Sequence, residues 1–230
     1  FMSDNGANGA MATLYPGNED GKYLSTFDNS LDNRGLKNSY IETGAGWAQA
    51  SSSPFRYFKS FASEGGIKVP LIVKLPGKTV NAGQWNDGFI HVTDIMPTIL
   101  EIAKAQYPEE YNGNKIHPAI GKSLMPVLKG DSISVHTIDG FGWELFEMKA
   151  YIKGNWKILR LPEPMGTGNW ELYNLKDDPA EANDLSSQFP DLKKQLIEEW
   201  NNYARFNEVY DHKGHFDALY RKNYMPEEDD

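Results

Sequence analysis

The sequence predicts an α/β unit followed by a smaller α+β subdomain, and three observations lead to this fold class. The apolar run Phe1-Met2-Ser3 ends in Asp4-Asn5, as expected of a strand with polar residues at its carboxyl end. Apolar residues recur at helical spacing after Thr93. Strand-like segments then precede an amphipathic helix. The predicted parts are the α/β unit in residues 1–130, the subdomain in 131–210 and a polar tail in 211–230.

Within the α/β unit, residues 8–53 are rich in Gly, Asn, Asp and Ser with interspersed aromatics, so we expect an ordered loop that walls a pocket. The apolar run Leu71-Ile72-Val73 predicts buried β-structure. Thr93 or Asp94 can cap a helix that ends near Gln106. Proline and glycine after it favour loops, with one short helix over 124–128.

The subdomain is expected to contain an antiparallel sheet. Residues 149–152, 156–161 and 170–175 are strand-like, and Lys153-Gly154-Asn155 is typical of a hairpin turn between the first two. The order of these segments along the chain predicts neighbouring antiparallel strands.

A C-terminal helix should cover one face of that sheet. Asp178-Pro179-Ala180-Glu181 has the pattern of a capping box, with an acidic N-cap and proline at the first helical position. One apolar helix face follows it, made of Leu192, Leu196, Ile197, Trp200 and Tyr203.

Composition excludes several classes of function. The formal net charge is −9 and no basic run is present, which argues against binding to nucleic acid. No apolar stretch is long enough to span a bilayer, so we expect no membrane partner. The chain has no cysteine, which excludes disulfides, thiolate metal ligands and a cysteine nucleophile among these residues.

Asp4 and Asn5 are the candidate metal ligands. A carboxylate and an amide carbonyl are oxygen donors that suit Ca²⁺ or Mg²⁺, and Gly6 allows the sharp turn beside them. Calcium takes about six to eight oxygens, so most of its ligands would come from elsewhere. Because only Phe1-Met2-Ser3 precedes this pair, we expect the chain to be cut at its N-terminus. Taken alone, the same residues also form an ordinary turn.

Lys59 is a candidate for contact with an anionic group. An ammonium group carries three donors and suits an anionic oxygen, although most lysines are solvated surface residues. Trp143 and Glu144 either line a substrate pocket or belong to buried aromatic packing.

Other polar residues are better explained by structure than by chemistry. His91 and Asp94 are interpreted as residues that start a helix and pack it, and Asp177-Asp178 as caps. The histidines and acids of the tail resemble a metal cluster, but their polar surroundings indicate solvated surface. These tail residues are Asp211, His212, His215 and Asp217.

Several ordered motifs together resemble the second half of a type I sulfatase, with bacterial arylsulfatases as the nearest match, from residue 1 to about residue 206. The motifs are Phe1-Met2-Ser3-Asp4-Asn5-Gly6-Ala7, Trp47-Ala48-Gln49-Ala50, Pro54-Phe55-Arg56, Lys59, Glu64-Gly65-Gly66-Ile67-Lys68-Val69-Pro70, His91-Val92-Thr93-Asp94-Ile95-Met96-Pro97-Thr98, Gly142-Trp143-Glu144-Leu145-Phe146, and Leu172-Tyr173-Asn174-Leu175 with Asp178-Pro179 and Glu181.

The resemblance implies the C-terminal portion of an alkaline-phosphatase-like catalytic domain that hydrolyses sulfate esters. In this family a formylglycine made from Cys or Ser attacks sulfur, and a calcium ion binds the nucleophile and the sulfate; Mg²⁺ is the less expected ion. The resemblance assigns Asp4 and Asn5 to the metal, and Lys59 to the sulfate and the leaving-group oxygen. It also implies a small-molecule or glycan sulfate ester as substrate and export to the periplasm or outside the cell.

The family's nucleophile motif and its first metal-binding aspartates lie N-terminal to Asp4. We therefore expect the missing N-terminal part of the same protein to be a partner of these residues, and the chain alone to be inactive. Two alternatives stay open: a phosphonate monoester hydrolase or phosphodiesterase of the same superfamily, and a non-catalytic binding or structural fragment.

Overall fold

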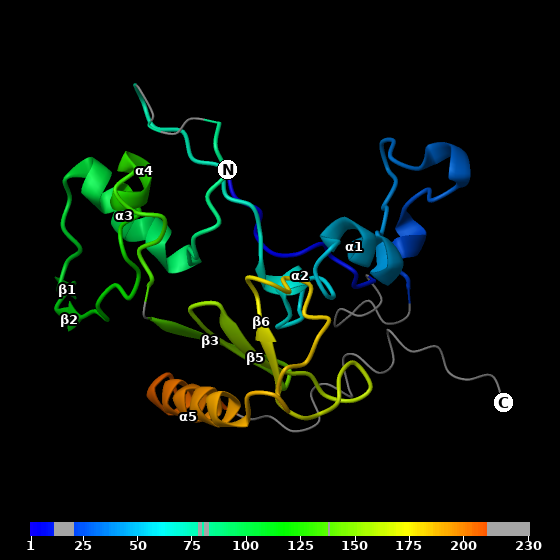
Figure 1. The fold of residues 1–230 in the computed structure, drawn as a ribbon. Helices are drawn as coiled ribbons and strands as arrows, with labels where there is room; N and C mark the ends of the chain where they lie inside the picture. The colour runs from blue at the N-terminus through cyan, green and yellow to red at the C-terminus, as the bar shows by residue number, and fades with distance from the viewer. Residues whose placement is uncertain (12–20, 78–79, 81–82, 138, 211–230) are drawn as a thin grey trace. The chain divides into compact units, whose positions relative to one another are not determined.

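A computed structural model describes residues 1–11, 21–77, 80, 83–137 and 139–210 (Figure 1). The chain forms two compact units. We call Phe1–Leu71 together with Gly140–Asp230 the sheet unit, and Ile72–Asp139 the α3 unit. The predicted domain boundary near residue 130 stays a prediction.

The sheet unit is built around a four-stranded antiparallel sheet in which chain neighbours pair in the order β3-β4-β5-β6. Its strands are β3 (Gly140–Leu145), β4 (Met148–Lys153), β5 (Trp156–Arg160) and β6 (Glu171–Asn174). The three predicted strands are confirmed, as is the hairpin turn, where Gly154 has a φ of 59°. Strand β3 was not predicted, because its two glycines interrupt the alternation that indicates a strand.

Helix α5 (Pro190–Phe206) contacts β3, β4 and β5 and lies along one face of the sheet (Figure 1). Leu196 and Trp200 are buried there, which confirms the predicted apolar helix face. The fold class, an α/β chain with a small antiparallel sheet and a C-terminal helix, is also confirmed.

The predicted helix start at Asp178 is wrong. The Asp178 carboxylate accepts hydrogen bonds from the backbone N–H groups of Ala182 at 3.1 Å and Asn183 at 2.8 Å, which closes a turn instead of a helix. Glu181 has a φ of 55°, outside the right-handed helical range, and its side chain points inward to an ion pair with Lys157. A buried tertiary contact therefore overrides the local capping signal.

Both faces of the sheet are buried, and the strands supply the two faces in alternation. Leu159 and Tyr173 belong to one apolar cluster, which includes Phe58 and Phe61 of the N-terminal segment. Their chain neighbours Ile158 and Leu172 belong to a second cluster under α5. Successive strand side chains point to opposite faces, so the N-terminal segment covers one face and α5 the other.

The N-terminal segment of the sheet unit contains more helix than expected. Its described residues form the short 3-10 helices η2 (Leu24–Thr26) and η3 (Leu31–Asn33) and the α-helices α1 (Gly44–Ser52) and α2 (Glu64–Ile67). Helix α1 falls inside the predicted long loop and was missed because its small residues give a weak amphipathic pattern.

The aromatic residues of this segment divide between two environments. Tyr23, Phe27 and Tyr40 contact one another, with ring centroids 5.2 to 5.6 Å apart. Trp47 on α1 is 74% exposed. The expected ordering of the loop by aromatic contacts is therefore seen in its described part.

The buried strand predicted at Leu71–Val73 is wrong. Met2 and Leu71 form a single antiparallel bridge, and Ile72 is 64% exposed. In the described residues no further strand pairs with this bridge, so the apolar side chains have no sheet to bury them.

The α3 unit contains η4 (Val92–Asp94), α3 (Ile95–Ala103), a small hairpin of β1 (Glu110–Tyr111) and β2 (Asn114–Lys115), and α4 (Met125–Lys129). The helix start at Thr93 or Asp94 and the short helix near 124–128 are confirmed. Helix α3 ends at Ala103, before the expected Gln106, because Lys104 takes a left-handed φ of 54°. None of the helices in the described ranges is long and apolar enough to cross a membrane.

Candidate metal and substrate site

The Asp4-Asn5-Gly6 loop is held in place by its backbone. The Ser3 N–H donates to Pro70 O at 3.2 Å, and the Gly6 N–H donates to Gly66 O at 3.1 Å. The loop is thus fixed at both ends to the segment that begins with α2. The structure brings two separate sequence motifs together here.

Gly6 is required for this close approach. A Cβ atom at Gly6 would lie 2.0 Å from Gly65 O and 3.0 Å from the Lys59 backbone nitrogen, which no side chain can tolerate without movement of the backbone. Gly66 is equally tight, because a Cβ there would lie 2.0 Å from Phe61 O. Gly6 therefore allows the loop to approach α2, and Gly66 allows α2 to pack against Phe61.

Asp4 and Asn5 line a cavity of about 480 Å³ in the sheet unit. Asn5 Nδ2 donates a hydrogen bond to Asp4 Oδ2 at 2.8 Å, so the two side chains point to the same place. Ser3 Oγ donates to the Asn5 carbonyl at 3.1 Å and fixes the turn between them. The remaining lining includes the serines 51–53, Phe55 and Lys68.

The donor set of this pair fits a hard cation. Asp4 Oδ1 and Asn5 Oδ1 are not used in the hydrogen bond between the two side chains, and both are oxygen acceptors of the type that Ca²⁺ binds. Among the described residues, no group of three or more His, Cys, Asp or Glu side chains is arranged to hold a metal ion. Asp4 and Asn5 would thus supply part of a coordination sphere.

Lys59 is placed beside this loop through its backbone. Its N–H donates to Ala7 O at 3.0 Å, only two residues beyond Asn5. The side chain is half-buried and is not among the described residues that line the cavity. The structure thus joins Lys59 to the Asp4-Asn5 motif in space, while its contact with substrate stays a prediction.

Lys68 is a cation of the cavity lining that sequence reasoning did not select. Its ammonium lies 4.9 Å from the centroid of the Phe55 ring, a cation–π contact that holds the side chain over the lining. The only signal for it in the sequence is its position in the segment after Gly65-Gly66.

Arg56 connects the motif segment to strand β6. Its guanidinium donates to Glu171 Oε2 and to Tyr173 Oη, both at 3.1 Å, and Tyr173 Oη donates to the same carboxylate at 2.7 Å. Burial opposes the charge of Arg56, but Tyr173 and Glu171 outweigh burial and raise its pKa. Burial and Glu171 also raise the pKa of Tyr173. The cluster thus links the segment before Lys59 to strand β6.

A buried charged triad formed by Glu64, Lys157 and Glu181 joins three distant parts of the chain. Lys157 Nζ lies 2.9 Å from Glu64 Oε1 and 2.7 Å from Glu181 Oε1, and all three residues are at most 6% exposed at the side chain. Glu181 Oε2 accepts the Glu64 N–H at 2.9 Å. Sequence reasoning missed the triad, because its members are up to 117 residues apart.

The triad shifts the pKa values of its members. Burial opposes the charge of Lys157, but the carboxylates of Glu181 and Glu64 outweigh it and raise the pKa of the lysine. Burial also raises the pKa of Glu181, against the opposing effect of Lys157. The cation is thus held charged between two carboxylates.

In the α3 unit, His91 and Asp94 start the helix, as predicted. Asp94 Oδ2 accepts the His91 N–H at 2.8 Å, and the His91 ring accepts the Thr93 N–H at 3.4 Å. Burial lowers the pKa of His91. His136, which sequence reasoning did not select, lies between Asp94 and Asp139, with ring nitrogens 2.8 Å from a carboxylate oxygen of each.

Trp143 is partly buried and packs against the apolar cluster on the side of the N-terminal segment. Glu144 Oε1 accepts the Glu147 N–H at 3.1 Å within the β3–β4 turn. The packing alternative fits the contact of Trp143, and substrate binding by Trp143 stays a prediction. The tail residues Asp211, His212, His215 and Asp217 lie outside the described residues.

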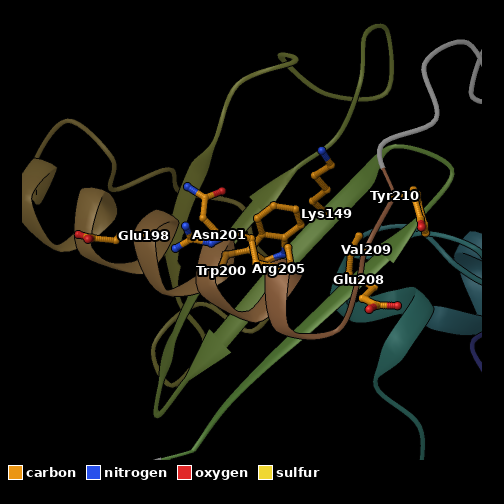
Figure 2. Close-up of a pocket in the computed structure, with 9 residues that line it drawn as sticks. Lys149, Glu198, Trp200, Asn201, Arg205, Glu208, Val209 and Tyr210 are labelled. Atoms are coloured by element: carbon orange, nitrogen blue, oxygen red, sulfur yellow. The ribbon is translucent and has the colours of Figure 1, made fainter.

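A second cavity, of about 760 Å³, lies at the end of α5 (Figure 2). Lys149 of β4 places its ammonium 5.1 Å from the Trp200 ring centroid, and Arg205 and Tyr210 also line the cavity. The ring centroids of Trp170 and Trp200 lie 5.4 Å apart. No predicted site residue lines this cavity.

The family described as "N-sulphoglucosamine sulphohydrolase, C-terminal" matches residues 54–205. A sulfatase of Schizosaccharomyces pombe is 38% identical over 205 residues, which cover 88% of this chain and 37% of that protein. An arylsulfatase of Klebsiella aerogenes is 33% identical over 128 residues, 55% of this chain and 27% of that protein. The chain thus spans less than two fifths of the length of either relative.

Solved structures agree in fold. The crystal structure of Ps i-CgsB in complex with k-i-k-neocarrahexaose has a TM-score of 0.55 at 22% identity, over 76% of this chain and 38% of that chain. A protein in complex with its substrate D-glucosamine-2-N,6-O-disulfate has a TM-score of 0.52 at 19% identity, over 73% and 33% of the two chains. The motifs, the family match and the relatives agree: this chain belongs to the type I sulfatase family and corresponds to its C-terminal half.

Proposed function

We propose that this chain forms one side of the active site of an enzyme that hydrolyses sulfate esters of sugars. Family membership supports hydrolysis of a sulfate ester. The complex of a structural neighbour with D-glucosamine-2-N,6-O-disulfate supports a sulfated sugar as substrate. The observation that carries the proposal is the docking of the Asp4-Asn5 loop onto the segment that contains Lys59 and Gly66.

Asp4 and Asn5 are proposed to hold calcium, in preference to magnesium, through their oxygen atoms. The ion, when bound, polarises the sulfate group and lowers the free energy of the charged transition state. The two side chains are held close together by their own hydrogen bond of 2.8 Å, so little ordering is needed to bind the ion. The nucleophile, a formylglycine, is proposed to come from residues outside these 230.

Lys59 is proposed to contact the sulfate and the leaving-group oxygen. Negative charge develops on that oxygen as the ester bond breaks, and a fixed ammonium group stabilises it more in the transition state than in the substrate. The hydrogen bond from the Lys59 N–H to Ala7 O supports this role, because it fixes the lysine backbone next to the metal ligands.

The test is Lys59→Ala in the full-length protein. We expect kcat/KM for a sulfate ester to fall about 100- to 1,000-fold, the usual cost of removing one group that stabilises transition-state charge. Lys194→Ala is the matched control, because this lysine is exposed on the outer side of α5. Unchanged kcat/KM in Lys59→Ala would remove this residue from the mechanism.

A substrate panel decides the reaction class. We expect turnover of sulfated mono- and oligosaccharides above that of aryl sulfates, and little turnover of phosphonate monoesters or phosphate diesters. Preference for the phosphorus esters would favour the other superfamily activity. Absence of all turnover in a folded, calcium-loaded protein would favour a non-catalytic role.

We also propose that the protein is exported to the periplasm or outside the cell, as the family resemblance implies.

A further inference from the structure

The triad of Glu64, Lys157 and Glu181 is connected to the candidate metal loop by a short series of direct contacts. Glu64 is the first residue of α2, and its backbone and side chain are both fixed by the triad. Two residues later, Gly66 O accepts the Gly6 N–H, and Pro70 O accepts the Ser3 N–H. Asp4 and Asn5 lie between those two hydrogen bonds.

The same segment also sets the position of Lys59. The Gly65 N–H donates to Arg56 O at 3.0 Å, and the Lys59 N–H donates to Ala7 O at 3.0 Å. Gly65 O is the atom that a side chain at Gly6 would strike. A shift of α2 would therefore move both motifs of the site, because backbone hydrogen bonds and the close approach of Gly6 to Gly65 join them.

Burying the charges of the triad costs the fold free energy. Burying charged groups carries a desolvation penalty, and apolar residues of similar volume often stabilise a fold as well or better. Lys157 has a side chain of 0% exposure in a strand whose neighbours Ile158 and Leu159 are apolar. An ion pair differs from an apolar contact because it fixes the orientation of the charged groups. Here it orients Glu64 and the start of α2.

We propose that Lys157 and Glu181 are positioning residues for the metal loop, which hold α2 so that Asp4 and Asn5 can bind a divalent cation. This inference rests on the proposed function of that loop. Neither residue contacts the loop itself. Their effect passes through Glu64, Gly65 and Gly66, and the expected loss on substitution resembles that of partners that orient metal ligands, about 10- to 100-fold in metal affinity.

The experiment uses the full-length protein and calcium alone as the probe. Lys157→Met keeps the length of the side chain and removes the charge, which leaves the two carboxylates facing each other. We expect the calcium dissociation constant, measured by titration calorimetry, to rise about 10- to 100-fold. At saturating calcium, we expect kcat/KM for a sulfate ester to recover only in part, because a shift of α2 also moves Lys59.

Glu181→Ala is the second variant, and it tests the positioning role if Lys157→Met does not fold. It removes the acceptor of the Glu64 N–H and leaves a neutral pair of Lys157 and Glu64. We expect the same direction of change in calcium affinity. Leu196→Ala is the control for lost stability, because Leu196 is a buried residue of α5 and is not in the cluster that contains Phe58 and Phe61. It should leave calcium affinity within about twofold while lowering the denaturant concentration at the midpoint of unfolding.

The outcomes separate the two proposals. Calcium affinity within twofold of the parent in both folded triad variants, with an active calcium-dependent parent, overturns the positioning role and leaves the proposed function intact. An equal loss of affinity in Leu196→Ala also overturns it, because the effect would then come from stability in general. A parent that neither binds calcium nor hydrolyses sulfate esters overturns the proposed function and this inference together.

Discussion

Gly6 shows how much one missing side chain matters for the site. Its sequence context predicts a turn, and glycine is common in turns for its backbone freedom. The structure gives a different reason, because Gly65 O occupies the place of a side chain. The requirement is spatial and depends on a segment that lies about sixty residues further along the chain.

A substitution at Gly6 tests this reason. Gly6→Ala should force the loop and α2 apart, lower stability by about 1–3 kcal/mol and weaken calcium binding. Denaturant unfolding and calorimetry of the full-length protein measure the two effects. The control is Gly46→Ala in α1, where a new Cβ meets nothing within 4 Å and alanine should be neutral or slightly stabilising. Equal changes in stability and in calcium affinity for the two variants would contradict the close approach of Gly6 to Gly65.

At the scale of elements, the start of α3 depends on a network of charged side chains. His136 lies between Asp94 and Asp139, and Lys122 forms an ion pair with Asp139. The hydrogen bonds from Lys122 and His136 lower the pKa of Asp139. A carboxylate whose folded pKa lies below its unfolded pKa stabilises the fold above the unfolded value, and this contribution is lost as the pH falls through the folded pKa.

Asp139→Asn should therefore destabilise the protein at pH 7 by no more than about 1 kcal/mol, since the group is partly exposed. The difference in the free energy of unfolding between the variant and the parent should shrink as the pH falls below about 4, where the carboxyl group of the unfolded chain is protonated. Denaturant unfolding between pH 3 and 7 measures it. Asp131→Asn, an exposed position in the same unit, makes the same change in charge and serves as the control. A difference that is constant with pH would contradict the ion-pair explanation.

Elements with strong local patterns were predictable. The strand-like composition of β4 and β5 and the apolar face of α5 follow from near neighbours in the sequence, and the structure confirms both strands and the helix face. Helix α1, strand β3 and the inward turn of Glu181 were not predictable in this way. Their local signals are weak or misleading, and contacts with distant parts of the chain decide them.

At the scale of the whole molecule, the chain is expected to lack activity by itself. Asp4 and Asn5 offer two of the roughly six to eight oxygens that calcium takes, and the proposed nucleophile lies outside the 230 residues. The purified chain, confirmed by mass spectrometry, should hydrolyse no sulfate ester under conditions in which the full-length protein is active. Turnover by a sample that contains this chain alone would contradict the prediction.

The sequence by itself determined the family, the candidate ligands Asp4 and Asn5, the candidate cation Lys59 and most of the sheet. These depend on residue type and short spacing, which a sequence displays directly. Only the tertiary structure decided that α2 joins the two motifs, and that Lys157 reaches Glu64 across 93 positions. The physical reason is that burial pairs charges by their distance in space, and distance along the chain carries no information about which carboxylate a buried lysine will meet.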